Sequence, residues 1–414
     1  MIYKSWQGFC LCGESQDVFP QGGQEVPAPF APLIFLVRRD PMTSRGFFAI
    51  GRLEELWEGE GLEILRPCRA QVPPSAPTEL AALVAQEGAG VLNVAFARAF
   101  SWLLAHKNPK KTGFRVTLVG LGDVGGTVLT GLKLLGREIA QIAIYDPNQA
   151  QCARYEMELN QILSPDGGPL PQVTVCREDE LFQCDLFAFT ASRGVPGLDS
   201  GVTDVRMAQF AANRQMLDTY AQKARQAEFQ GVFCQISDPV DLLSRAVFLA
   251  SNRDAAGNDD FAGLLPEQVQ GFGLGVMAAR AAYYAGKRGM DFTHGRAYGP
   301  HGQGLVIANH WAADQYDPAL SEELTKQTRE ANLRVRDLGF KPYIAPGLSS
   351  AAISLLQLLR GEDHYGAVPL AGTYFGCRSR YTPQGLAVVR EELCQPLMDR
   401  LAQTHGQLRE LDVP

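Results

Sequence analysis

The chain has 414 residues, of which 46% are hydrophobic and 20% are charged. This length allows two or three domains, and this composition excludes wholesale disorder. The net charge of −7 disfavours an extended nucleic-acid surface, and no uninterrupted apolar run reaches the roughly 18 residues that span a bilayer. The N-terminal residues lack the basic and apolar regions of a signal peptide. We therefore expect a cytoplasmic protein with no nucleic-acid or membrane partner.

The first quarter of the chain is rich in proline and reads as short strands broken by turns. The expected strands are Gly8–Leu11, Leu33–Arg38, Gly46–Ile50 and Leu62–Leu65. From Pro77 an apolar pattern with a proline near its first turn predicts a helix that continues to about His106. We expect residues 1–76 to form a small β-rich extension and residues 77–113 a helix and linker.

After residue 113, strand patterns alternate with helix patterns. The expected strands are Arg115–Val119, Ile142–Tyr145, Val173–Cys176, Leu186–Ala191 and Gly231–Ile236. The expected helices are Thr127–Leu135, Gln149–Leu163 and Arg206–Glu228. This alternation predicts an α/β fold with a parallel sheet covered by helices on both faces. We expect a doubly wound Rossmann domain at residues 114–245, followed by an α+β substrate domain at residues 246–414.

A glycine-rich turn follows the strand that ends at Val119 and opens a helix, which fits the pattern G-x-G-x-x-G. Its first glycine allows a tight turn, its second lets the backbone approach a pyrophosphate, and its third lets helix and strand pack closely. The helix N-terminus presents free N–H groups to phosphates. The cofactor-binding residues expected here are Gly120, Gly122, Asp123, Val124 and Gly125.

Asp146 ends the next strand, where a carboxylate would accept the ribose hydroxyls and repel a 2′-phosphate. The predicted cofactor is therefore NAD rather than NADP. No metal site is expected, because Cys10 and Cys12 form the only close cysteine pair and no second cysteine or histidine pair has zinc spacing.

From Phe114 to about Val388 the chain resembles the lactate/malate dehydrogenase family of NAD-dependent 2-hydroxyacid dehydrogenases. Seven segments that resemble family motifs fall in the family's order. They are the glycine turn at 120–126, the second strand and its helix at 145–160, the strand at 184–192 before the mobile loop, the Arg…Asn segment at 206–213, the Ser-Asn-Pro-like strand end at 236–243, the arginine-bearing helix at 271–280 and the histidine loop at 298–304. The resemblance implies further cofactor contacts at Thr190 and Ala191, and a homodimer or homotetramer.

The resemblance also implies roles in moving a hydride to or from a substrate carbon. His301 takes the position of the acid/base at the substrate oxygen, which suits histidine near neutral pH. Arg280 takes that of the arginine that holds the substrate carboxylate. Arg206 takes that of the loop arginine that polarises the carbonyl and excludes water. Asn213 and Ser349 fall where the family has substrate-contacting side chains.

Two positions depart from the family. The family has an aspartate three residues before the helix arginine, where it hydrogen-bonds the catalytic histidine, and this chain has Met277 there. The family's asparagine in Ser-Asn-Pro is here Asp238. Because an unpaired carboxylate is costly to bury, we expect a basic partner for Asp238.

Three interpretations remain open. In one, Asp238 replaces the missing partner of His301 and acts in ordinary oxoacid reduction. In the next, its charge favours an amine or iminium group, so the enzyme acts on an amino or imino acid. In the last, the protein has lost the chemistry and binds NAD in a sensing or structural role.

The loop between Thr190 and Asn213 is longer than the usual family connection, so the position that separates malate from lactate substrates cannot be aligned. Arg193 is a candidate to bind a second substrate carboxylate, and a surface role explains it equally well. The substrate predicted is a small carboxylate of open identity.

Overall fold

The structure is a computed structural model of the chain. It describes residues 1–414 except 75, 108–109, 111, 194–204 and 412–414, and of residues 205–208 it describes only the backbone. No helix of the described residues combines the length and the apolar character needed to cross a bilayer.

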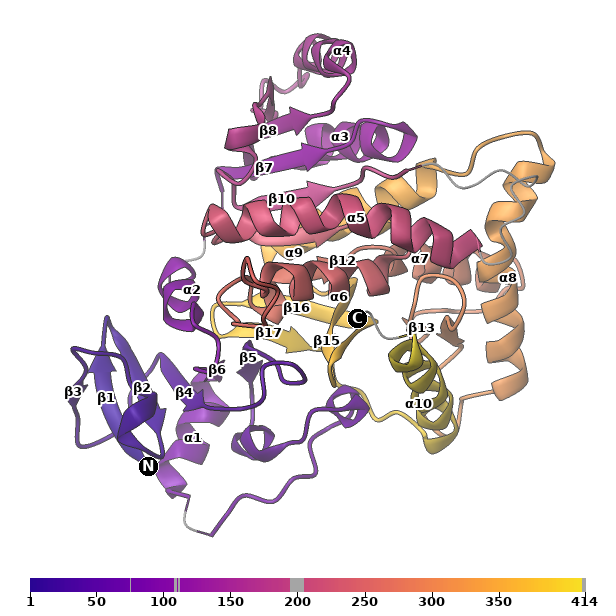
Figure 1. Cartoon of the computed structure of the whole chain (residues 1–414). Helices are drawn as coiled ribbons and strands as arrows, with labels where there is room; N and C mark the ends of the chain where they lie inside the picture. The colour runs from indigo at the N-terminus through magenta and orange to yellow at the C-terminus, as the bar shows by residue number, and fades with distance from the viewer. Residues whose placement is uncertain (75, 108–109, 111, 194–204, 412–414) are drawn as a thin grey trace.

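Fifteen strands of the described residues form one mixed sheet (Figure 1). Six neighbouring strands are parallel and run in the order β9-β8-β7-β10-β11-β12. Their bounds are β7 Phe114–Val119, β8 Ile139–Tyr145, β9 Gln172–Val175, β10 Leu186–Phe189, β11 Val232–Gln235 and β12 Val269–Gly271. Numbered along the chain this is the order 3-2-1-4-5-6 of the doubly wound nucleotide-binding sheet. The predicted Rossmann fold and α/β class are therefore confirmed.

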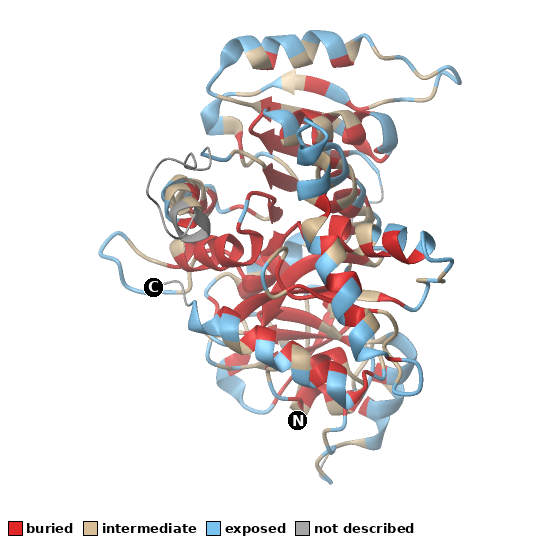
Figure 2. Cartoon of the chain, turned by 90° about the vertical axis from the view of Figure 1, so that its right-hand side faces the viewer, coloured by how far each residue is buried: buried red, intermediate tan, exposed pale blue. Residues whose placement is uncertain are grey.

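Helices α3, α4, α5 and α6 connect these strands, and α9 comes from later in the chain. Two pairs of these helices pack together. One pair is α5 with α6, and the other is α3 with α9. Their bounds are α3 Asp123–Leu135, α4 Gln149–Asn160, α5 Val205–Gln226, α6 Val240–Ser251 and α9 Ile353–Arg360. Buried residues concentrate along the sheet, and the outer faces of the helices are exposed (Figure 2). Strands β10, β11 and β12 are buried along their whole length, as expected where helices cover both faces of a parallel sheet.

The C-terminal half continues the same sheet. An antiparallel meander follows β12, joined to it where Gly271 pairs with Ala367. Its strands are β15 His364–Leu370, β16 Thr373–Thr382 and β17 Gly385–Val388. Outside the sheet lie a two-stranded hairpin and further helices. They are β13 Arg296–Tyr298, β14 Val306–Ala308, α7 Leu274–Gly286, α8 Pro318–Asp337, the π-helix η6 Pro346–Ala352 and α10 Gln395–Glu410.

The N-terminal extension adds the remaining strands to the same sheet. Its strand β5 pairs in parallel with β17, where Phe48 faces Leu386. The elements of this region are β1 Ile2–Trp6, β2 Phe9–Gly13, β3 Gln24–Glu25, β4 Leu33–Val37, β5 Phe47–Ile50, β6 Ala89–Asn93, α1 Thr78–Glu87 and α2 Ala99–Ala105. One hydrophobic cluster contains residues of the extension, of the Rossmann strands and of α10. The extension therefore shares a core with the rest of the chain.

Two sequence expectations for this region are wrong. The continuous helix predicted from Pro77 to His106 is two helices with strand β6 between them. Gly88 ends α1 with a φ of +69°, a conformation that suits glycine. Strand β6 is buried along its whole length between β4 and β5, and such a strand has the same continuous apolar pattern as a buried helix. Leu62–Leu65 is a 3₁₀ turn and not a strand.

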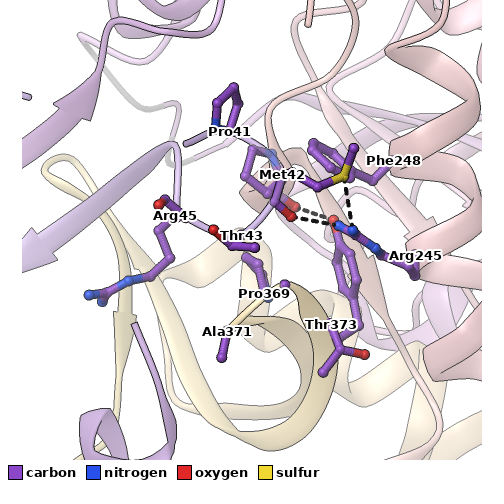
Figure 3. A pocket seen from close by; sticks show the side chains of 13 residues that line it. Pro41, Met42, Thr43, Arg45, Arg245, Phe248, Pro369, Ala371 and Thr373 are labelled. Atoms are coloured by element: carbon purple, nitrogen blue, oxygen red, sulfur yellow. Dashed lines mark hydrogen bonds between the residues drawn. The ribbon is translucent and has the colours of Figure 1, made fainter. Parts of the chain in front are cut away.

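The extension is held by buried polar contacts. The fully buried carboxylate of Glu267 accepts hydrogen bonds of 2.9 and 3.0 Å from the N–H groups of Gly46 and Phe47, at the start of β5. Burial raises the pKa of Glu267 to about 7, although these N–H donors offset part of the effect. Near the contact between Glu267 and β5, Arg245 of α6 donates a 3.2 Å hydrogen bond to the carbonyl of Met42 (Figure 3). The cavity there measures about 10 Å³, room for about one water molecule and not for a substrate.

Candidate active site

The glycine turn has the geometry that a dinucleotide requires. Gly120 has a φ of +94°, and a Cβ there would collide with the backbone of Ala191. A Cβ at Gly125 would collide with the carbonyl oxygen of Gly120, so this glycine allows the close packing of α3 on β7. At Gly122 no atom of the described residues lies within 4 Å of an added Cβ. A phosphate therefore has room to approach the backbone at Gly122 and the N-terminus of α3.

Asp146 lies beside this turn. Its two carboxylate oxygens each accept a 2.8 Å hydrogen bond, one from the N–H of Leu121 and the other from the N–H of Asn148. The side chain is thus fixed at the carboxyl end of β8. Each carboxylate oxygen keeps acceptor capacity, which ribose hydroxyls could use.

Hydrogen bonds link the ends of β10 and β11 to the glycine turn. They involve Thr190, Ala191 and Ser237. The Thr190 hydroxyl lies 2.7 Å from the carbonyl oxygen of Gly120 and donates to it. The Ser237 hydroxyl donates a 2.6 Å hydrogen bond to the carbonyl of Ala191. These contacts tie the ends of β10 and β11 to the glycine turn. Asp123 and Val124 form the first turn of α3, where Lys341 lies 3.0 Å from the Asp123 carboxylate.

His301 and Asp238 meet at the carboxyl edge of the parallel strands. Asp238 follows β11, and His301 lies in the loop between β13 and β14. The Nδ1 atom of His301 lies 3.1 Å from Oδ1 of Asp238. The backbone N–H of His301 also donates a 3.4 Å hydrogen bond to Asp241 of α6. The structure therefore gives Asp238 a basic partner.

The other ring nitrogen of His301 has no such contact. Its Nε2 is shielded from solvent and has no hydrogen-bond partner among the described residues. The imidazole as a whole keeps 15% of its surface exposed, and the Asp238 side chain keeps 51%. The Asp238 side chain is therefore open to solvent, whereas Nε2 of His301 is a buried nitrogen without a hydrogen-bond partner among the described residues.

Asn213 is fully buried and connects three segments. Its amide donates to the backbone carbonyl of Asp238 at 2.8 Å, and its Oδ1 accepts from the N–H of Arg193 at 2.9 Å. It also lies within hydrogen-bond distance of the Ser192 hydroxyl. Asn213 thus positions Asp238 and the start of the loop, and its own polar atoms are used in doing so. Arg193 is exposed beside the segment 194–204. That segment lies outside the described residues, as does the side chain of Arg206.

Arg280 does not join this cluster in the described contacts. Its guanidinium contacts the Asn332 amide oxygen on α8, and Met277 packs in the apolar cluster between α7, α8 and the β13–β14 hairpin. Arg280 therefore makes no described contact with His301 or Asp238. Ser349 is half-buried in η6, where its carbonyl accepts from Ser354.

Ser350 is a positioning residue that the sequence reasoning missed. Its hydroxyl donates a 2.7 Å hydrogen bond to the carbonyl of Gly273 and accepts a 2.9 Å bond from the N–H of Val276. It caps the first turn of α7, close to His301, because a Cβ at Gly273 would lie 2.8 Å from the His301 Cβ. The only signal for it is the adjacent pair Ser349-Ser350, and that pair does not tell which serine faces the helix end.

The described residues contain no group placed to hold a metal ion, and their cysteine thiols are mostly buried. No group of three or more histidine, cysteine or acidic side chains in the described ranges is placed to hold a metal ion. All nine cysteines are free, and burial raises the pKa of several of their thiols, such as that of Cys12 to about 12.

No protein-family model matches the chain. Among curated proteins, an L-lactate dehydrogenase of Treponema denticola is 29% identical over 198 residues, which are 47% of this chain and 56% of the relative. The chain thus spans little more than half the length of that relative.

Solved structures are similar over a larger part of the chain. A minor L-lactate dehydrogenase from Enterococcus mundtii has a TM-score of 0.60 at 18% identity, covering 73% of this chain and 98% of its own. A lactate dehydrogenase from a Medee basin deep-sea metagenome library has a TM-score of 0.59 at 18% identity, covering 72% and 98%. A malate dehydrogenase from Archaeoglobus fulgidus, solved in complex with NADH, has a TM-score of 0.58 at 17% identity, covering 72% and 97%. The chain thus has the fold of these lactate and malate dehydrogenases over about 72% of its length, and part of its sequence is similar to an L-lactate dehydrogenase.

Proposed function

We propose that the chain is an NAD-dependent oxidoreductase that moves a hydride between NAD(H) and the 2-carbon of a small 2-hydroxy or 2-oxo acid. His301 is the acid/base of this reaction, and Asp238 orients it. The observation that carries the proposal is the Asp238–His301 contact of 3.1 Å, with Nε2 of His301 left without a hydrogen-bond partner among the described residues. A histidine held at Nδ1 by a carboxylate presents Nε2 to a substrate oxygen, as in other acid/base pairs.

The residues around the glycine turn fit an NAD molecule. Gly122 leaves space at the N-terminus of α3 for a pyrophosphate. Asp146 is fixed where it would accept ribose hydroxyls and repel the 2′-phosphate of NADP. When bound, the nicotinamide supplies or accepts the hydride. The protein's own part is to hold the cofactor, to orient the substrate oxygen at His301 and to move the proton there.

The remaining roles come from the family resemblance. Arg206 and Arg193 would act from the loop that follows β10, and Arg280 and Ser349 would contact the substrate. The described contacts place Arg280 against Asn332 and not against His301. The same resemblance supports a homodimer or homotetramer, which sedimentation of the purified chain would test.

Reduction of an imine is a second candidate, because of the exposure of Asp238. Half of its side chain is open, and only Oδ1 contacts His301. The free oxygen could pair with a cationic nitrogen on the substrate. This candidate predicts turnover only when ammonia or an amine accompanies the oxoacid.

One experiment separates these functions. NADH oxidation is followed with a panel of 2-oxoacids, each with and without ammonium or a primary amine, and NAD binding is measured by calorimetry. Turnover of an oxoacid alone supports the proposed dehydrogenase, and turnover that requires the amine supports the imine reductase. Tight NAD binding with no turnover on either panel would show that the protein binds the nucleotide without this chemistry.

A further inference from the structure

An ion pair joins the glycine turn to a distant segment of the chain. Nζ of Lys341 lies 3.0 Å from Oδ2 of Asp123, although 218 positions separate the two residues. Asp123 is the first residue of α3, and Lys341 lies in the segment 338–345 between α8 and η6. The pair therefore places a cation of the C-terminal half at the N-terminus of α3, where the glycine turn leaves room for a phosphate.

The segment that carries Lys341 is held against α3. It leads directly into η6, which packs on α3. A Cβ added at Gly347 of η6 would lie 2.8 Å from the Thr127 Cβ and 3.3 Å from the carbonyl oxygen of Val124. Because η6 approaches the first turn of α3 this closely, its packing brings the backbone at Lys341 to that turn. The position of Lys341 therefore does not depend on its ion pair alone.

The charge of Asp123 conflicts with a nucleotide at this turn. The N-cap of α3 is Gly122, which has no side chain to bond the free N–H groups of the first turn. A carboxylate beside them stabilises the positive end of the helix. It would also repel the anionic pyrophosphate that the proposed function brings to the same N–H groups. A cation that moves from the carboxylate to the pyrophosphate would remove this conflict.

Lys341 has the exposure and the charge that this role requires. Its side chain keeps 79% of its surface exposed, and that of Asp123 keeps 51%. An ion pair this exposed contributes little to stability, so Lys341 can leave Asp123 at low cost. The carboxylate raises the pKa of the Lys341 ammonium, which keeps the group charged. Its flexible four-carbon stem lets the ammonium turn to a phosphate beside Asp123 without a movement of the backbone.

We propose that Lys341 is a cofactor-binding residue, which pairs with Asp123 in the free protein and with the pyrophosphate of NAD in the complex. The inference rests on the proposed function, because it requires a nucleotide at the glycine turn. It adds to that site a residue from the C-terminal half, which neither the glycine pattern nor the family resemblance assigned. Asp123 then competes with the pyrophosphate for the ammonium and limits the affinity for NAD.

Calorimetric titration of the full chain with NADH and with ADP tests the proposal, since both ligands carry linked phosphates. Lys341→Gln should raise both Kd values about tenfold, because the phosphates lose a charged partner. Asp123→Asn should lower both about threefold or more, because it removes a repulsion and a competitor. A purely structural ion pair predicts instead that the two variants change the Kd in the same direction, because they break the same contact.

A ligand and a variant serve as controls. Adenosine has no phosphate, so its affinity, measured by competition with NADH, should change less than about twofold in both variants. Lys326→Gln removes the same charge from an exposed position on α8. About 17 Å of helix separates Lys326 from the end of α8. This variant should leave the Kd of NADH within about twofold of the unmodified chain.

Three results would overturn the proposal. They are an effect of Lys341→Gln on NADH and ADP no larger than that of Lys326→Gln, shifts of Lys341→Gln and Asp123→Asn in the same direction, and an equal loss of adenosine affinity. Any of them, with NADH still bound by the unmodified chain, leaves the dehydrogenase proposal standing. If the unmodified chain binds neither NADH nor ADP, the proposed nucleotide site is wrong, and this inference is wrong with it.

Discussion

The Asp238 carboxylate lies 3.1 Å from Nδ1 of His301, although 63 positions separate the two residues in the chain. The contact joins the end of β11 to the loop between β13 and β14. Asn213 donates a hydrogen bond to the Asp238 backbone carbonyl, and Asp241 accepts one from the His301 backbone N–H. Backbone hydrogen bonds therefore position both members of the pair.

Asp238→Asn removes the charge beside His301 but keeps a polar side chain of the same size. We expect the kcat/KM for oxoacid reduction to fall at least about tenfold, because the imidazole loses its charged partner. The Kd for NADH should stay within about twofold, which shows that the fold is intact. Steady-state kinetics with calorimetry measures both. Unchanged kcat/KM would remove Asp238 from the proposed chemistry.

Gly122 and Gly125 form a matched pair of positions in the nucleotide turn. Gly122→Ala should leave the melting temperature nearly unchanged, since its Cβ would meet no atom within 4 Å in the described part of the chain. It should weaken NAD binding about tenfold or more, because its methyl group occupies the approach of the pyrophosphate. Gly125→Ala should instead lower the free energy of unfolding by about 3 kcal/mol, because its Cβ collides with the carbonyl oxygen of Gly120.

Thermal unfolding and calorimetry distinguish the two glycine variants. If Gly122→Ala binds NAD as tightly as the unmodified chain, the pyrophosphate does not lie on this turn. If Gly125→Ala folds with unchanged stability, the close approach of α3 to β7 is not required.

Asp146→Asn tests the choice of cofactor. The amide keeps one acceptor oxygen for the turn but loses the negative charge that repels a 2′-phosphate. We expect weaker binding of NADH, tighter binding of NADPH and so a smaller preference between the two. Fluorescence titration with each nucleotide gives the ratio. A preference that does not change would mean that Asp146 does not set it.

The raised pKa of Glu267 predicts that the stability of the fold depends on pH. Its pKa is raised from 4.5 to about 7 in the folded chain, so the folded state holds a proton that the unfolded state has released between these values. Stability from this group is therefore complete below about pH 4.5 and is lost as the pH rises to about 7, a loss of about 3 kcal/mol.

The control for Glu267 is Glu267→Gln, which does not titrate. Its overall stability should be lower, because its amide N–H₂ faces the donors at Gly46 and Phe47. Urea unfolding of both proteins at pH 5 and pH 8 isolates the difference. An identical pH dependence in the two proteins would contradict the raised pKa.

The sequence predicted the Rossmann half well because its signals are local. Each strand from β7 to β11 is a short apolar run next to a helical pattern, and Gly120 and Asp146 stand at the strand ends where nucleotide chemistry needs them. The strands of the N-terminal extension were harder to predict, because they pair with segments that are distant in the sequence. Nothing local in Phe48 indicates that it faces Leu386, and the buried strand Ala89–Asn93 has the same pattern as a helix core.

The candidate site was predictable in part for the same reason. Resemblance indicated His301, and the sequence analysis left open whether Asp238 is its partner. The expectation of a basic partner depended on a buried carboxylate, but half of the Asp238 side chain is exposed. The direction of Arg280 was not predictable, because a position on a helix does not tell which neighbour its long side chain contacts. Its contact with Asn332 depends on how α7 and α8 pack.

The most direct test of the proposed function is His301→Gln, assayed for NADH oxidation on the best substrate of the oxoacid panel. The account predicts a fall in kcat/KM of about 10² to 10⁴, since the variant cannot exchange a proton at the substrate oxygen. Its Kd for NADH should stay within about twofold of the unmodified chain. Turnover that survives the substitution, with NADH bound as before, would contradict His301 as the acid/base.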